Sequence, residues 1–215
     1  MPEESRASAF KPLGATTFLA PVPAVMVSCR GTQPPHDKDN IITVAWAGTV
    51  CSAPPMLSIS VRKSRFSHEQ LMQSRCFYVN LVSQELCKAT DFCGVKSGRD
   101  LDKFAACSLT PVRLPALADA PAIAQSPICL ACRVESVQEL GSHDLFLARI
   151  LEVYVQEGLI GEKGEVCMER ARLCAYSHGE YYALGRVLGF FGYSVASDAA
   201  LKRRMPKKNQ PKRKG

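Results

Sequence analysis

Residues 40–50 read NIITVAWAGTV, a run of β-favouring residues in which two kinds of side chain alternate. In a β-strand successive side chains point to opposite faces, so parity sorts the residues onto two faces. One expected face is bulky and apolar, with Ile42, Val44, Trp46 and Val50. The other is small and carries two hydroxyls, with Thr43, Ala45, Ala47 and Thr49. The stretch therefore predicts a strand whose second face can support a flat ring.

Further strand-like runs lie on both sides of this stretch. They cover residues 22–29, 56–62, 76–82, 128–137 and 145–155. Helical signals are fewer: residues 67–74, which open with a Ser67/Gln70 capping box, then 83–93 and 100–106. Residues 140–142 predict a hairpin between two long strands, and the proline-rich residues 111–127 predict a long connection. The expected fold is mainly β, a barrel with a few helices at its rim.

Length and composition indicate one domain with tails. The 215 residues are 47% apolar and can build one sizeable core. We expect a lead-in over residues 1–20, the barrel over 21–157, a C-terminal elaboration packed on the barrel over 158–200, and a basic disordered tail over 201–215. No apolar run reaches the roughly 18 residues of a membrane helix, and the polar start lacks the order of a secretory signal. A cytoplasmic protein without a membrane partner is expected.

Charge is concentrated at the C-terminus. The formal net charge is +7, but residues 201–215 hold eight Lys or Arg and no acidic residue. The rest of the chain therefore has 19 basic and 20 acidic residues and is nearly neutral. A basic tail permits nonspecific contacts with nucleic acid or an acidic partner. The neutral body argues against such binding as the main activity.

A second chemical signal follows the strand at residues 56–62. Arg62, Lys63 and Arg65 crowd into the turn just before Ser67. If Ser67 caps a helix, the helix N-terminus and these cations together favour a phosphate group. A ring-supporting face followed by a phosphate site suits a mononucleotide.

Several segments together resemble the flavin reductase-like, FMN-binding split-barrel family, which includes flavoredoxins. They are NIITVAWAGTV, SAPPMLSISVRKSRFSHEQL, FYVNLVS, DFCGVKSGRDLDKF and LGSHDLFLARI, in this order over residues 21–156. The resemblance implies an FMN-binding split β-barrel with a C-terminal extension. It also implies a homodimer with FMN near the subunit interface, and electrons taken from NAD(P)H or from a redox protein.

The resemblance also implies site residues. It puts Thr43, Ala45, Trp46 and Thr49 along the isoalloxazine ring, and Arg62, Ser64, Arg65 and Ser67 around the phosphate. The pocket would be completed by Asn80, Leu81, Ser97, Asp100 and Lys103. His143 occupies the position from which related flavin reductases present a histidine toward the nicotinamide, and is the candidate catalytic residue.

The favoured function is an FMN-dependent oxidoreductase that passes electrons from NAD(P)H through bound FMN to an acceptor. The alternative is a flavoredoxin-like electron-transfer protein without direct use of NAD(P)H. Hydride transfer is the chemistry of the flavin, so no acid/base dyad is required of the protein. An alternative from a different functional class is a module that binds nucleic acid or an acidic partner through its basic tail.

Structural roles are the alternatives for several of these residues. Thr43 and Thr49 are also ordinary strand residues, the arginines can form a solvated cluster, and His143 can be a turn residue. Cys129 and Cys132 lie three apart in a predicted strand and face opposite ways, which favours structural thiols. Cys51 and Cys93 lie near the flavin motifs, but buried cysteine is mostly apolar filling. The four histidines show no metal-binding spacing, so no metal is expected.

Overall fold

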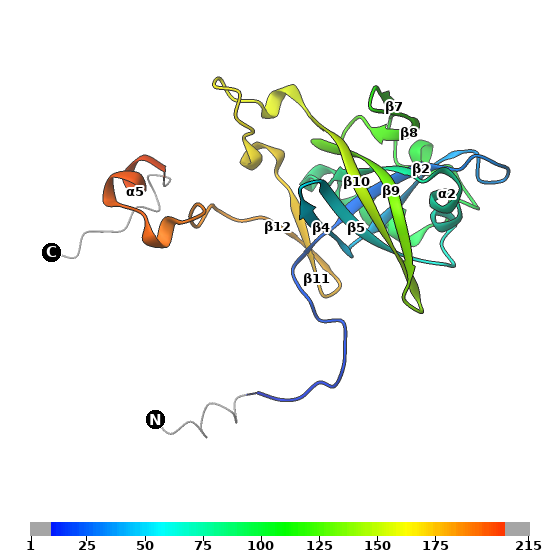
Figure 1. Ribbon diagram of the computed structural model, residues 1–215, viewed down its shortest axis with the longest axis horizontal. Coiled ribbons are helices and arrows are strands. Elements are labelled where there is room, and N and C mark those ends of the chain that lie inside the picture. Colours follow the sequence, from blue (N-terminus) through cyan, green and yellow to red (C-terminus); the bar gives the residue numbers. More distant parts are fainter. Residues whose placement is uncertain (1–9, 205–215) are drawn as a thin grey trace. The chain divides into compact units, whose positions relative to one another are not determined.

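The computed structural model describes residues 10–204. The chain divides after Ala183 into two compact units. In the first unit, seven antiparallel strands form one sheet in the order β3-β2-β6-β9-β10-β5-β4 (Figure 1). Their bounds are β2 Val25–Arg30, β3 Asp39–Val44, β4 Ala47–Ser52, β5 Pro55–Arg62, β6 Cys76–Leu81, β9 Ile128–Glu139 and β10 His143–Val155.

The two edges of this sheet meet. β3 and β4 are the edge strands, yet only Ala45 and Trp46 separate them in the chain. Two residues are too short to bridge a flat sheet of seven strands, so the sheet curls into a barrel. The main-chain N–H of Ser60 in β5 donates to the carbonyl oxygen of Trp46 at 2.9 Å. The predicted mainly β barrel is confirmed.

The barrel interior is apolar and comes from alternate positions of its strands. Its fully buried members include Val27, Ile59, Phe77, Cys132 and Phe146. A second apolar cluster lies between the other face of β2 and β3 and the helix α3, and includes Met26 and Ile41. Because β3 is covered on both faces, its sequence is a nearly continuous apolar run.

Closure of the barrel corrects one sequence-based expectation. We predicted a single strand over residues 41–50, but β3 ends at Val44 and the chain bends at Ala45 and Trp46 before β4 begins. Ile42 and Val44 share one face as predicted, and both are buried, whereas Trp46 is 45% and Val50 53% exposed. The predicted bulky face is therefore wrong beyond Val44, because the bend breaks the parity that assigned it.

Four short helical segments follow β5 and β6. They are α2 Phe66–Ser74, η1 Gln84–Leu86, α3 Cys87–Val95 and α4 Lys103–Ala106. α4 starts at Asp102, whose carboxylate accepts from the N–H of Ala105 at 3.2 Å. The predicted capping box of α2 is wrong: the helix starts one residue earlier, with Arg65 at the N-cap and no side-chain cap bond. Ser67 lies inside the first turn, where its hydroxyl accepts from Asn40.

Two hairpins complete the barrel region. β9 and β10 form the long predicted hairpin, and Gly141 takes a positive φ of 86° in its turn. The predicted connection over residues 111–127 is instead largely a hairpin of β7 Pro111–Leu114 and β8 Leu117–Ile123. The Tyr78 hydroxyl of β6 donates to the carbonyl oxygen of Leu117 at 3.1 Å. Tertiary contacts with β6 thus order a segment whose prolines indicated an irregular connection.

The C-terminal part of the first unit returns to its beginning. β1 Val22–Pro23, β11 Cys174–Ser177 and β12 Glu180–Ala183 form a small sheet, after the short helices η2 Glu157–Leu159 and η3 Met168–Ala171. The division after Ala183 falls within the predicted elaboration over 158–200.

The second unit contains η4 Tyr193–Val195 and α5 Asp198–Arg204. Residues 201–204 of the predicted disordered tail lie in α5, and the rest of that tail lies outside the described residues. Among residues 10–204, every helix is too short or too polar to cross a membrane.

Candidate functional site

A wide cleft of about 720 Å³ lies at the bend between β3 and β4, which is a typical size for a small-molecule site. One side consists of the end of β3, the bend, the end of β5, the start of β10 and the end of α3, which packs against β3. The opposite side consists of residues 17–20 and the β11–β12 hairpin. The lining includes Thr43, Ala45, Trp46, Arg62, Arg65, Asp91, Gly94, His143, Tyr176, His178 and Tyr181.

Six of the described lining residues carry aromatic or imidazole rings. Trp46 from the bend and His143 from β10 lie with ring centroids 4.6 Å apart, at an interplanar angle of 41°. On the opposite side Phe18 contacts His178 at 4.5 Å, and Tyr176 contacts Tyr181 at 5.3 Å. Aromatic side chains combine large apolar surfaces with polar tips. The wide cleft is thus suited to a flat, partly polar ligand.

The wide cleft also has many polar groups in its lining. The Thr43 hydroxyl donates to the carbonyl oxygen of Thr90 in α3, which fixes the side chain against the helix. Burial, reinforced by the nearby Asp91, raises the pKa of Tyr181 to about 12. Burial and then the positive charge of Arg62 lower the pKa of His143, which favours the neutral imidazole.

A second cleft of about 440 Å³ adjoins the first and shares Ile42, Arg62 and Arg65 with it. We call it the basic cleft. Its lining holds five cationic side chains and, among the described residues, no Asp or Glu. The lining residues are Asn40, Ile42, Arg62, Ser64, Arg65, Phe66, Ser67, Lys96, Ser97, Gly98, Arg99 and Lys103. Such an excess of positive charge favours an anion.

Local structure places these cations. β5 ends at Arg62, and the next turn carries Arg65 to the N-terminus of α2, where free N–H groups and the helix dipole also favour an anion. Arg99 donates to the carbonyl oxygen of Ser64 at 3.1 Å and so joins the loop after α3 to this turn. The Arg99 guanidinium also lies 5.7 Å from the centre of the Phe66 ring.

Lys103 is the buried cation of the basic cleft. It is 3% exposed, and its ammonium donates to the carbonyl oxygens of Ile41 at 2.7 Å and Cys93 at 2.8 Å. Burial lowers the pKa of Lys103. The two bonds tie α4 to β3 and to the end of α3, so this lysine also holds the floor of the cleft together.

The structure brings most of the predicted site residues together. Thr43, Ala45, Trp46, Arg62, Arg65 and His143 line the wide cleft. Ser64, Ser67, Ser97 and Lys103 line the basic cleft, together with Arg62 and Arg65. The segments that carry them are separated by up to 100 residues in the chain, and the closed barrel places them side by side.

Four predicted site residues lie elsewhere: among the described residues, the linings of the two clefts do not include Thr49, Asn80, Leu81 or Asp100. Asn80 is fully buried, and its amide donates to Met26 and Ser28 at 2.8 Å while its oxygen accepts from Ile123 at 3.0 Å. Leu81 packs against the apolar core. Thr49 in β4 and Asp100 after α3 are exposed.

Other lining residues were not predicted. Asn40 and Arg99 lie inside quoted motifs, and their charge or polarity was the available signal. Tyr176, His178 and Tyr181 come from the β11–β12 hairpin, where the sequence shows no clear period. The pairing of β11 with β1 and the bond from the Cys174 N–H to the Val82 carbonyl oxygen, at 3.0 Å, place them beside the cleft.

Cys129 and Cys132 are buried in the apolar core. Cys129 packs in a cluster under β8, whereas Cys132 packs inside the barrel, so the two face opposite sides of β9 as predicted. All ten are free thiols, and burial raises the pKa of Cys93 and Cys132 to about 12. Within residues 10–204 no cluster of three potential metal ligands occurs.

Known proteins share this architecture. Flavoredoxin of Desulfovibrio vulgaris (Miyazaki F) is 29% identical, with a TM-score of 0.77 over 84% of this chain and 96% of the flavoredoxin. The FMN-binding protein of Thermus thermophilus has the same fold at 23% identity, with a TM-score of 0.66 over 81% of this chain and 92% of that protein.

Sequence comparison agrees with the structural similarity. An uncharacterized protein of Archaeoglobus fulgidus is 31% identical over 117 residues, which span 54% of this chain and 66% of the relative. Residues 19–185 match the model of the flavin reductase like domain, and this range contains nearly the whole lining of both clefts. The chain therefore belongs to the flavin reductase like domain family.

Proposed function

We propose that the chain binds FMN, with the isoalloxazine ring in the wide cleft and the phosphate in the basic cleft. The observation that carries this proposal is the junction of the two clefts at Ile42, Arg62 and Arg65. One cleft is walled by rings, and the other is lined by five cations. A ligand that fills both has a flat ring at one end and an anion at the other.

The basic cleft fits a phosphate dianion. Arg62, Arg65 and Arg99 offer guanidinium donors, and hydrogen bonds from cations to phosphate oxygens are among the stronger ones in proteins. The N-terminus of α2 adds main-chain N–H groups. The described lining of the cleft includes no carboxylate that would repel a dianion.

The wide cleft fits the ring. Its floor at Thr43 and Ala45 has small side chains, and Gly94 of α3 adds none. Trp46 and His143 stand at one edge and supply apolar and polar surface together. A flat ring can therefore lie along the end of β3.

Bound FMN supplies the redox chemistry, because the flavin ring accepts a hydride or single electrons. The residues of the chain position and shield the reacting groups. We propose that His143, which lies next to Trp46, holds the nicotinamide of NAD(P)H against the ring. Arg62, at the junction of the clefts, would hold the cofactor in place for this step.

Steady-state oxidation of NADH and NADPH tests the proposal. The FMN-loaded protein should oxidise one of them, and added free flavin should change the rate little if FMN stays bound. A protein that holds FMN but oxidises neither donor is instead a flavoredoxin-like electron carrier, reduced by a protein partner. A protein that holds no flavin under any condition contradicts both functions.

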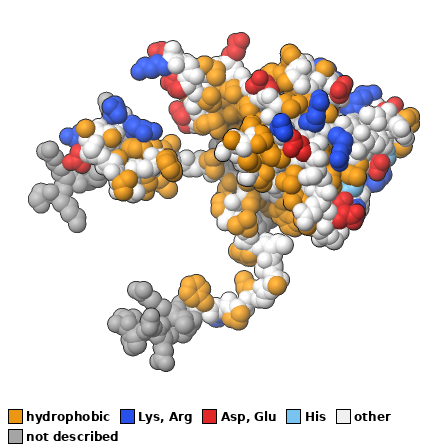
Figure 2. Space-filling model, viewed as in Figure 1, with side chains coloured by type: hydrophobic (Ala, Val, Ile, Leu, Met, Phe, Trp, Pro, Cys, Tyr) orange, Lys and Arg blue, Asp and Glu red, His pale blue; other side chains and the backbone are white. Residues whose placement is uncertain are grey.

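We further propose that the chain forms a homodimer. Trp46, Val50 and Val153 are each more than 40% exposed, and Leu151 is 38% exposed. In Figure 2 hydrophobic side chains gather over the part of the barrel where Figure 1 draws β4 and β10. Exposed apolar patches on a folded domain are typical of interfaces, and Trp46 extends this one to the wide cleft. Sedimentation should give twice the chain mass, and Leu151→Glu with Val153→Glu should give the monomer mass.

A further inference from the structure

Helix α3 and the end of α4 bring two free thiols together. Cys93 lies near the end of α3 and is fully buried, and Cys107 directly follows α4. Both pack in the second apolar cluster, Cys93 as a buried member and Cys107 against it. Burial and then the neighbouring Cys107 thiol raise the pKa of Cys93 to about 12. The two thiols are therefore neighbours, although residues 94–106 separate them in the chain.

Hydrogen bonds hold both cysteines in place. The Lys103 ammonium donates to the carbonyl oxygen of Cys93 at 2.8 Å, and the N–H of Cys107 donates to the carbonyl oxygen of Lys103 at 3.1 Å. The N–H of Leu109 then returns to the carbonyl oxygen of Phe104 at 2.8 Å. Because Phe104 and Leu109 are both buried in the cluster, this turn keeps Cys107 against it.

The two thiols differ in accessibility. Cys93 is enclosed, whereas Cys107 is partly exposed and lines a third cleft of about 460 Å³. Within the described residues, the third cleft shares no lining residue with the wide cleft or the basic cleft. A small oxidant that enters the third cleft therefore meets Cys107 first, because accessibility decides which thiol is oxidised.

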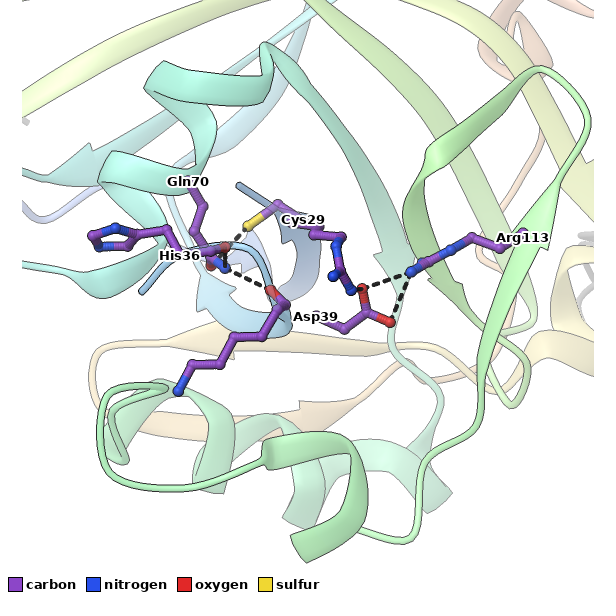
Figure 3. Close-up of polar contacts among 7 residues, drawn as sticks. Cys29, His36, Asp39, Gln70 and Arg113 are labelled. Carbon is purple, nitrogen blue, oxygen red and sulfur yellow. Dashed lines mark hydrogen bonds and ion pairs between the residues drawn. The ribbon is translucent and has the colours of Figure 1, made fainter. Parts of the chain in front are cut away.

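Other buried cysteines have different neighbours. Cys29 is also fully buried, but its thiol donates to the side-chain oxygen of Gln70 at 3.5 Å (Figure 3). The Cys132 thiol donates to the carbonyl oxygen of Leu130 at 3.4 Å. A carbonyl or amide oxygen only accepts a hydrogen bond and forms no covalent bond with sulfur. Cys93 differs from both, because its neighbour is a second thiol.

The segment between Cys93 and Cys107 carries much of the basic cleft. Five of its residues line that cleft, namely Lys96, Ser97, Gly98, Arg99 and Lys103. A bond between the two sulfur atoms would close this segment into a covalent loop and restrict its motion. It would join the same two ends that Lys103 already links by hydrogen bonds.

We propose that Cys93 and Cys107 form a reversible disulfide that clamps the loop lining the basic cleft. Hydrogen peroxide is the oxidant. The Cys107 sulfur attacks one peroxide oxygen, so that an S–O bond forms, the O–O bond breaks, and the thiol proton leaves with the other oxygen as water. The Cys93 sulfur then attacks the sulfenic sulfur, so that the S–S bond forms and the hydroxyl group leaves with the Cys93 proton as a second water. Two thiols are oxidised, and one peroxide is reduced to two water molecules.

Peptide mapping by mass spectrometry tests the disulfide itself. The protein is treated with hydrogen peroxide, remaining thiols are blocked, and digests are compared with and without dithiothreitol. We expect a linked peptide that joins Cys93 to Cys107 and separates on reduction. Cys87 and Cys174 are also neighbours, so the linked peptides have to be sequenced to assign the bond. A protein that yields no Cys93–Cys107 peptide at any peroxide concentration overturns the inference.

Flavin affinity tests the clamp, and this part rests on the proposed function. After removal of peroxide, the oxidised protein should bind FMN about two- to tenfold more tightly than the reduced protein, because the lining is fixed before the ligand arrives. Lumiflavin has no phosphate and should bind both forms alike. Equal or weaker FMN binding by the oxidised form overturns the clamp. If neither form binds flavin, the proposed function fails, while peptide mapping still decides whether the disulfide forms.

Two serine variants assign the effect. Cys107→Ser removes the partly exposed thiol and keeps the buried Cys93, so peroxide should no longer change its FMN affinity. Cys51→Ser is the matched control, because Cys51 in β4 is also partly exposed, and it should respond to peroxide as the parent does. A response that persists in Cys107→Ser, or is lost in Cys51→Ser, would show that another thiol is responsible and would overturn the inference.

Discussion

Arg62 and Arg65 stand at the junction of the two clefts, and both side chains are exposed. Replacing both by Ala should weaken FMN binding far more than riboflavin binding, since only FMN carries the dianion. Because solvent screens exposed charges, we expect each substitution to weaken FMN binding by about three- to tenfold. Fluorescence titrations with the two flavins measure the difference.

Lys63 provides the control for this experiment. It lies between the two arginines in the chain, but it pairs with Glu139 at 2.6 Å, and among the described residues neither cleft lining includes it. Lys63→Ala removes one positive charge from the same turn and should change FMN affinity little. If the double arginine variant loses riboflavin and FMN equally, the phosphate lies elsewhere.

His143 lines the wide cleft beside Trp46. His143→Ala should slow the reduction of bound FMN by NAD(P)H and leave FMN affinity nearly unchanged, because hydride transfer depends steeply on how the donor is positioned. Stopped-flow absorbance of the flavin band reports the rate. Dithionite needs no docked nicotinamide and should reduce parent and variant alike. If NAD(P)H reduces the flavin of the variant as fast as that of the parent at every donor concentration, His143 is only a turn residue.

The difference between Arg62 and Asn40 shows what the sequence can predict of a site. Clustered cations before a helix are visible in the sequence, and Arg62 and Arg65 were predicted on that basis. The position of Asn40 in the lining of the basic cleft depends on its hydrogen bond to Gln70, thirty residues later. A partner that lies so far along the chain leaves no local signal.

Helix α2 and strand β10 are joined by a buried pair. The His68 ring nitrogen and the Asp144 carboxylate lie 2.7 Å apart, and both side chains are nearly inaccessible. His68→Ala leaves this carboxylate with Lys63 at 3.5 Å as its remaining charged partner. We expect the free energy of unfolding to fall by about 1.5–3 kcal/mol.

Urea unfolding followed by circular dichroism measures this loss. Glu69→Ala is the control, because Glu69 is the next residue of α2 and is exposed. It should change the free energy of unfolding by less than about 0.5 kcal/mol. Equal effects of the two substitutions would show that the pair does not hold α2 to β10.

At the level of elements, the strands were predictable and their interruptions were not. Alternation identified β5, and continuous apolar runs identified β9 and β10. Neither residue of the bend, Ala45 or Trp46, is a glycine or proline, so the sequence does not indicate a bend there. It exists because β3 and β4 become the two closing edges of the barrel, which is a property of all seven strands. The capping box failed for a related reason, since Asn40 engages the Ser67 hydroxyl.

For the whole molecule, the described lining of both clefts lies within residues 17–181. Removing the second unit by truncation after Ala183 should therefore leave FMN affinity within about twofold of the parent and the unfolding temperature nearly unchanged. Flavin titration and thermal unfolding of the two proteins provide the comparison. A truncated chain that loses flavin would show that residues 184–215 take part in the site.

The central claim is that one FMN spans the two joined clefts of each chain. A crystal structure of the protein grown with FMN tests it most directly. The account predicts the ring along Thr43 to Trp46 and phosphate oxygens at hydrogen-bonding distance, about 3 Å, from Arg62 or Arg65. Electron density for FMN at any other place, or empty clefts in crystals grown at saturating FMN, would contradict it.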